Sequence, residues 1–264
     1  MFCCWRALWR TQPANLAGLA LSVLFVVAHG AVPVQARAQN VAAAEQPANS
    51  FDTSAKRMQA CTTCHGAASR GGRTANEAYF PRIAGKPAGY LFNQLQNFRD
   101  GRRHYGLMVG MVEYLDDAYL QEMAQYFAQL DLPYPPPTPP RAGTPASMLA
   151  LGKTLVLQGD ATRGLPACAA CHGAALMGMQ PAIPALLGLP RDYMAGQIGA
   201  WQTGLRRAHA PDCMAAIAQK LTAQDVEALT TWLAAQPVPA GAKPAPQTAL
   251  TQAMPLPQTC GGLR

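Results

Sequence analysis

Cys61-Thr62-Thr63-Cys64-His65 and Cys168-Ala169-Ala170-Cys171-His172 are two copies of one motif, in which two cysteines are separated by two residues and followed directly by a histidine. At this spacing both thiols can add to one porphyrin, and the histidine is then held beside the iron. A thioredoxin-like cysteine pair would need a βαβ context, and a zinc site would need four ligands where each copy offers three. The motifs therefore predict two covalently bound haem c groups, attached through the four cysteines, with His65 and His172 as iron ligands.

The two motifs belong to a longer internal repeat. Ten landmarks after the first motif are Pro81, Ile83, Gly85, Tyr90, Gln94, Phe98, Gly101, Arg103, Met108 and Leu115. Their counterparts after the second motif, in the same order, are Pro184, Leu186, Gly188, Tyr193, Gln197, Trp201, Gly204, Arg206, Met214 and Leu221. The spacing between partners drifts by only a few residues, so the chain holds two copies of one fold with small loop differences.

A proline-rich stretch separates the copies and sets the domain boundaries. Residues 133–146 cannot form a helix or a central strand, and we expect a stiff polyproline linker there. This gives an N-terminal domain at 39–132 and a C-terminal domain at 147–240. The last segment, 241–264, is rich in Ala, Pro, Gln and Gly, and we expect a poorly ordered tail.

The periodicity within each copy is helical. Apolar residues recur at helix-face spacing in residues 90–98, 120–130, 193–201 and 226–233. Asp116 or Asp117 is placed to cap the second of these helices and Thr222 the fourth. Strand-like alternation is nearly absent, so we predict an all-α fold.

The N-terminus has the three parts of a secretory signal peptide. Arg6 and Arg10 precede the apolar run Leu16–Ala28, and Ala36-Arg37-Ala38 supplies a cleavage site. The apolar run is shorter than the roughly 20 residues that span a bilayer, which argues against the alternative of an uncleaved anchor. Residues 1–38 are therefore expected to direct export to the periplasm and to be removed.

Composition excludes several classes of protein. Half of the 264 residues are hydrophobic and 13% are charged, which is enough apolar material for packed cores. The net charge is +7, but no run of five or more lysines and arginines occurs, so nucleic-acid binding is not expected. We expect membrane contact only through partner proteins.

Each iron needs a sixth ligand or an open position. Met108 and Met214 stand at matched places ahead of the last helix of each copy, and a thioether there favours reduced iron. We predict both as axial ligands. The alternatives are Met111, Met177 and Met179, or the loop histidines His104 and His209.

Other residues have supporting roles in this hypothesis. The carbonyls of Pro81 and Pro184 are candidate acceptors for the second ring nitrogen of each histidine, although both prolines could be plain turn residues. The arginines placed to pair with haem propionates or to form a docking rim, with solvated surface positions as the alternative, are Arg102, Arg103, Arg206 and Arg207. Cys213 and Cys260 remain after export, either as a disulfide or as free or intermolecular thiols.

Residues 55–236 resemble the dihaem cytochromes of the c4 type, built from two tandem class I cytochrome c domains. The likeness rests on the two cysteine motifs, on Phe80-Pro81-Arg82-Ile83-Ala84-Gly85, on Tyr90-Leu91-Phe92-Asn93-Gln94-Leu95 and on the methionine loops. It implies that His65 and Met108 ligate one iron, that His172 and Met214 ligate the other, and that the haems face each other across the domain interface. Asp212-Cys213 beside Met214, the long linker and the long tail depart from the family pattern.

Three functions follow, from two classes. The first is a periplasmic carrier that relays single electrons between respiratory redox proteins, such as a quinol-oxidising complex and a membrane oxidase. The second is a cytochrome subunit that accepts electrons from a separate dehydrogenase. The third is an enzyme, a dihaem peroxidase or thiosulfate-oxidising enzyme, which would need one open iron. Two six-coordinate irons leave no position for a substrate, so we predict an electron carrier and no catalytic residue.

Overall fold

The computed structural model describes residues 54–66, 70–73, 79–246, 248 and 259–263. The signal peptide expected at residues 1–38 lies outside them. Among the described residues no helix is long and apolar enough to cross a membrane. Residues Asn49–Arg264 form one compact unit, and within it we call residues 54–132 the first half and residues 133–263 the second half.

The first half consists of short helices around one apolar core. Its elements are α1 (Ser54–Arg57), α2 (Gln59–His65), β1 (Gly72–Arg73), β2 (Tyr79–Phe80), α3 (Ala88–Arg99), α4 (Gly106–Val112) and α5 (Asp117–Gln129). The two-residue strands pair antiparallel. Helix α3 packs against α4 and α5, and Leu91, Phe98, Leu120 and Phe127 lie in the shared core.

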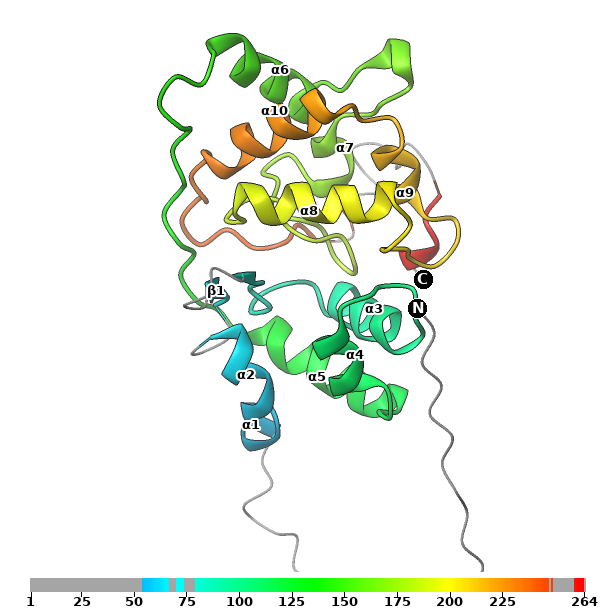
Figure 1. The fold of residues 1–264 in the computed structure, drawn as a ribbon. Coiled ribbons are helices and arrows are strands. Elements are labelled where there is room, and N and C mark those ends of the chain that lie inside the picture. The colour runs from blue at the N-terminus through cyan, green and yellow to red at the C-terminus, as the bar shows by residue number, and fades with distance from the viewer. Residues whose placement is uncertain (1–53, 67–69, 74–78, 247, 249–258, 264) are drawn as a thin grey trace, which may run out of the picture. The chain divides into compact units, whose positions relative to one another are not determined.

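The second half repeats this arrangement, with a first helix of 12 residues where α1 has four. Its elements are α6 (Ala146–Leu157), η2 (Ala161–Arg163), α7 (Cys168–His172), α8 (Arg191–Gln202), α9 (Cys213–Ala218), α10 (Ala223–Ala234) and η3 (Gly261–Leu263). Helix α10 packs against both α6 and α8 (Figure 1). The all-α fold and the four helices expected from periodicity are confirmed as α3, α5, α8 and α10.

The predicted helix starts are confirmed by their hydrogen bonds. Asp116 caps α5 by accepting from the backbone N–H of Tyr119 at 2.8 Å. Thr222 and Asp225 form a capping box at the start of α10. The buried Asp225 carboxylate also accepts from Arg163 at 2.6 Å, so one side chain ties the helix start to the η2 turn.

Gly152 sets the crossing of α6 over α10. A Cβ at this position would lie 2.2 Å from the carbonyl oxygen of Ala228 and 2.9 Å from the Cβ of Trp232. No side-chain rotation can relieve the contact with the carbonyl, because that oxygen belongs to the helix backbone. The close approach of the two helices therefore requires glycine here.

Gly152→Ala is expected to destabilise the second half by about 2 kcal/mol, because one extra methyl forces the two helices apart. Urea unfolding followed by circular dichroism measures the change. Gly196→Ala is the matched control, since Gly196 is an exposed residue of α8 with open space around its Cβ position. That control should gain about 0.5–1 kcal/mol from the better helix propensity of alanine. Equal stability of Gly152→Ala and the wild type would contradict the packing argument.

The linker at residues 133–146 is hydrogen-bonded to the first half and to the end of α10. Arg82, which is buried, donates to the carbonyls of Pro133 and Leu132 at 2.9 and 2.6 Å, and its guanidinium lies 4.0 Å from the centre of the Tyr134 ring. Further along, the N–H of Thr138 donates to the carbonyl of Ala234 at 2.8 Å. The linker has no regular secondary structure, but these contacts fix where it runs.

The tail differs from the expectation of poor order where the structure describes it. The N–H of Ala245 donates to the carbonyl of Gly178 at 2.9 Å. Residues 259–263 carry η3 and a disulfide between Cys260 and Cys213. The bridge confirms the disulfide alternative for these two cysteines. Residues 249–258 of the tail lie outside the described residues.

Candidate haem site

Helices α2 and α7 present the cysteine motifs. Both helices end at the motif histidine, and His65 and His172 are each only 7% exposed. All four motif cysteines are free thiols. Burial raises the pKa of the Cys61 thiol, and raises that of Cys168 to about 11. The thiols of Cys61 and Cys168 are therefore neutral groups in buried surroundings, which does not suit a thiolate metal site.

Backbone carbonyls orient the two histidines as predicted. The Nδ1 of His65 lies 2.7 Å from the carbonyl oxygen of Pro81, and the Nδ1 of His172 lies 2.8 Å from that of Pro184. A carbonyl can only accept, so Nδ1 must carry the proton and Nε2 keeps its lone pair. Burial lowers the pKa of both imidazoles despite this hydrogen bond. Each histidine is thus a neutral imidazole whose Nε2 lone pair is available to an iron.

A largely apolar cavity of about 250 Å³ joins the motif of the second half to its methionine loop. Its lining includes Cys168, Cys171, His172, Met214 and Trp201. Residues of the first half, among them Lys86, Tyr90 and Gln94, line the same cavity. The structure thus brings together the predicted attachment and ligand residues of the second half, at a place that the first half helps to close.

Most of the alternative axial ligands differ in position from the predicted methionines. Met108 is half-buried against the same core as Cys61, whereas Met111 is 48% exposed. In the second half Met214 lines the cavity. Met177 is 1% exposed and packs in the core, and neither it nor Met179 lines the cavity. His104 is exposed, whereas His209 lines the same cavity as Met214, and its Nε2 lies 3.2 Å from the guanidinium of Arg102.

Arg103 and Arg206 form a symmetric bridge between the halves. Their backbones pair as an antiparallel β-bridge. Arg103 donates to the side-chain oxygens of Gln94 and Gln197 at 2.9 and 2.7 Å. Arg206 donates to the same two oxygens at 2.9 and 2.8 Å. The repeat thus places its paired arginines and glutamines around one pseudo-twofold axis.

This bridge is a buried positive centre. Arg206 is 5% exposed, and burial together with the neighbouring Arg103 lowers its pKa to about 10. Burial also lowers the pKa of Lys86. Within the described part of the chain no carboxylate pairs with Arg103, Arg206 or Lys86. An unpaired buried cation is costly, so the site is built for an anionic group.

Trp201 adds a second feature that suits a carboxylate. Its indole Nε1 is buried and has no acceptor among the described residues, although the ring lines the cavity. The guanidinium of Arg206 lies 3.8 Å from the centre of the same ring. Sequence reasoning used Trp201 only as a repeat landmark. The cavity therefore has thiols and an imidazole for a haem and donors for its propionates.

The other two candidate arginines lie at the surface. Arg102 is half-buried and pairs with Asp100 at 2.8 Å, and Arg207 is exposed, with its backbone N–H donating to the carbonyl of Arg102. Among the described residues no group of three or more His, Cys, Asp or Glu side chains could hold a bare metal ion.

Comparison with known proteins shows which family the chain is similar to. The cytochrome c family model matches residues 149–236. A thiosulfate dehydrogenase electron acceptor from Thiomonas intermedia strain K12 is 38% identical over 178 residues, which are 67% of this chain and 79% of the relative. Cytochrome c4 from Pseudomonas aeruginosa strain PAO1 is 31% identical, covering 66% of this chain and 82% of the relative. The crystal structure of reduced recombinant cytochrome c4 from Pseudomonas stutzeri matches with a TM-score of 0.57 and 26% identity, over 69% of this chain and 96% of that one.

These relatives are named as electron acceptors or electron carriers and not as enzymes, which confirms the prediction of an electron-transfer protein. The helical repeat, the neutral buried histidines and the cavity with its cationic edge are what such a protein needs to hold haem. The chain belongs to the cytochrome c4-type family of dihaem c-type cytochromes, which carry covalently bound haem and accept electrons from a partner.

Proposed function

We propose that the chain carries two haem c groups and serves as the electron acceptor of a thiosulfate dehydrogenase. The first haem is attached through Cys61 and Cys64, and the second through Cys168 and Cys171. His65 with Met108 and His172 with Met214 complete the two iron coordination spheres. One observation carries this proposal. Each half holds a histidine hydrogen-bonded to a proline carbonyl, and the Arg103–Arg206 bridge joins the two halves within one unit.

Bound haem supplies a one-electron iron couple. The chain's own residues decide how that couple behaves. The Pro81 and Pro184 carbonyls hold each imidazole in the tautomer that leaves Nε2 free, so no proton has to move when the charge on the iron changes. Arg103, Arg206 and Lys86 would offset the charge of the propionates, and the Trp201 N–H would be available to donate to one of them. The apolar lining keeps water away from the second iron.

The choice of partner rests on the relatives. The Thiomonas intermedia protein is named for accepting electrons from thiosulfate dehydrogenase. Residues 1–38 have the pattern of a signal peptide, so we place the mature protein in the periplasm, with the domains at 39–132 and 147–240. From there it would pass electrons to a terminal oxidase, directly or through another cytochrome.

The test uses the mature oxidised protein, whose mass should exceed that of the polypeptide by two porphyrins. Thiosulfate alone is expected to leave both haems oxidised. Thiosulfate with a catalytic amount of a purified thiosulfate dehydrogenase should reduce both haems, measured as the rise of the reduced visible spectrum. Reduction by thiosulfate without the dehydrogenase would instead support the enzyme hypothesis. No reduction in either case would overturn the choice of partner.

A further inference from the structure

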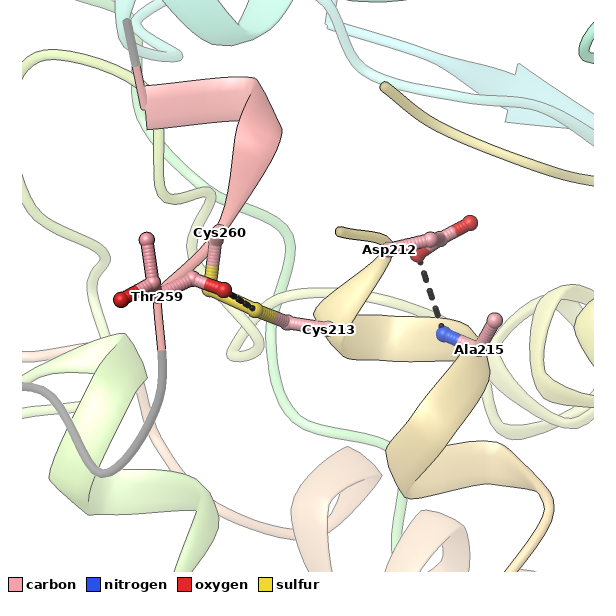
Figure 2. The surroundings of a disulfide bond; sticks show 5 residues. All are labelled: Asp212, Cys213, Ala215, Thr259 and Cys260. Carbon is pink, nitrogen blue, oxygen red and sulfur yellow. Dashed lines mark hydrogen bonds between the residues drawn. A yellow bond between two sulfur atoms is a disulfide. The ribbon is translucent and has the colours of Figure 1, made fainter. Parts of the chain in front are cut away.

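The ligand loop of the second half is joined to the tail by a covalent bond. Cys213 and Cys260 form a disulfide across 47 residues of sequence (Figure 2). Cys213 is the first residue of α9 and directly precedes Met214. In the first half the corresponding residue before Met108 is Leu107, which is 61% exposed. Only the second ligand loop therefore has a cysteine available for such a bridge.

The helix that carries Met214 is too short to be stable alone. Helix α9 has six residues, and a helix of that length depends on contacts outside itself. Asp212 supplies one such contact by accepting from the N–H of Ala215 at 3.0 Å (Figure 2). It also accepts from the N–H of Ala208 at 2.6 Å. The disulfide fixes Cys213, the residue between Asp212 and Met214.

Residues 259–263, which we call the strap, are held at several points. The N–H of Gly261 donates to the carbonyl of Pro211 at 3.0 Å. A Cβ at Gly261 would lie 2.2 Å from the carbonyl oxygen of Ala210, so the strap lies directly on the ligand loop. The Sγ of Cys213 also lies 3.2 Å from the carbonyl oxygen of Thr259. A disulfide sulfur has no proton to donate, so this is a close contact and not a hydrogen bond.

The strap also reaches the first half and the cavity. The side-chain amide of Asn93, on α3, donates to the carbonyl of Gly262 at 2.6 Å. Cys260, Gly262 and Leu263 line the same cavity as His172 and Met214. The strap is thus anchored to α3 and to the ligand loop at once, and any outward movement of Met214 would have to carry the strap with it.

We propose that the strap is a positioning element that holds Met214 on the second iron. It keeps small the fraction of molecules in which Met214 has left the iron. The second haem therefore resists added ligands and keeps the higher potential that thioether ligation gives it. The first haem has no such restraint on the residue before Met108. This inference rests on the proposed coordination of the second iron by Met214.

The test compares the wild-type holoprotein with the C213S/C260S variant. Added imidazole binds an iron only when the thioether has left, so its apparent affinity reports the released population. We expect the affinity of the second haem for imidazole to rise on the order of tenfold or more in the variant. The far-red sulfur-to-iron band of that haem should weaken and its potential should fall. Leu107→Ser is the matched control in the first half and should leave both haems unchanged.

A second sample keeps the test decisive if the C213S/C260S variant does not fold. The folded wild-type protein is reduced, alkylated at both thiols and reoxidised, with mass spectrometry confirming the two modifications. The same rise in imidazole affinity is expected. Wild-type affinity at the second haem in either sample would overturn the strap's role and leave the proposed coordination standing. A wild-type protein without a far-red band from the second haem would overturn the coordination and the strap's role together.

Discussion

Replacing Met214 by alanine is expected to remove the far-red sulfur-to-iron band of one haem and to lower its potential by about 60 mV or more. A thioether favours reduced iron, so its loss shifts the couple toward the oxidised state. About 60 mV is a tenfold change for a one-electron equilibrium. Met108→Ala should do the same to the other haem. Potentiometric titration with spectra recorded at each potential measures both effects.

Met111→Ala is the control for this pair. Met111 lies on the same helix as Met108 but is 48% exposed, so its removal should leave the band and both potentials at their wild-type values. A variant of Met111 that loses the band, with Met108→Ala unchanged, would reverse the assignment. High-spin iron in the oxidised wild type would instead indicate an open position.

Replacing Arg206 by methionine is expected to destabilise the holoprotein by about 3 kcal/mol or more. The substitution removes the donor to Gln94 and Gln197 and leaves propionate charge buried without its cation. Loss of a nearby positive charge also stabilises the oxidised iron, so the potential should fall. Denaturant unfolding of the oxidised protein and titration of both haems measure these changes.

Arg191→Met is the matched control, because Arg191 pairs with Glu227 at the surface, at a distance of 3.7 Å. Surface pairs of this kind contribute about 0–1 kcal/mol. The double variant of Arg103 and Arg206 should lose less than the sum of the single variants, since both arginines share the same glutamine acceptors. If Arg206→Met had wild-type stability and wild-type potentials, the bridge would not be a propionate site.

The sequence predicted those parts of the fold that depend on residues close together in the chain or matched in the repeat. The periodic helices, the caps at Asp116 and Thr222, and the proline carbonyls all follow from residues that lie close in sequence or recur in the repeat. Helix α6 was not predicted, because its apolar residues surround the helix and show no single face. Gly152 lies within this helix, and glycine disfavours a helix in sequence-based prediction. Its presence is explained only by the close crossing with α10.

The electrostatics of the site required the tertiary structure. Arg206 and Gln94 are 112 residues apart in sequence, and nothing local indicates that they meet. Lys86 was not singled out, and the N–H of Trp201 becomes informative only because it is buried without an acceptor among the described residues. Composition alone suggested that the tail is poorly ordered, whereas Cys260 and Gly261 are held by a single partner segment, 210–213.

The anchoring of the linker has a practical consequence for protein engineering. Arg82 holds the linker's first residues and Thr138 bonds to Ala234, whereas Arg141, Ala142 and Gly143 form an exposed turn after these contacts. An affinity tag or protease site inserted in this turn would not disturb the anchored stretch. After cleavage the two fragments would still share the arginine bridge, so they should migrate together on a native gel and separately on a denaturing one.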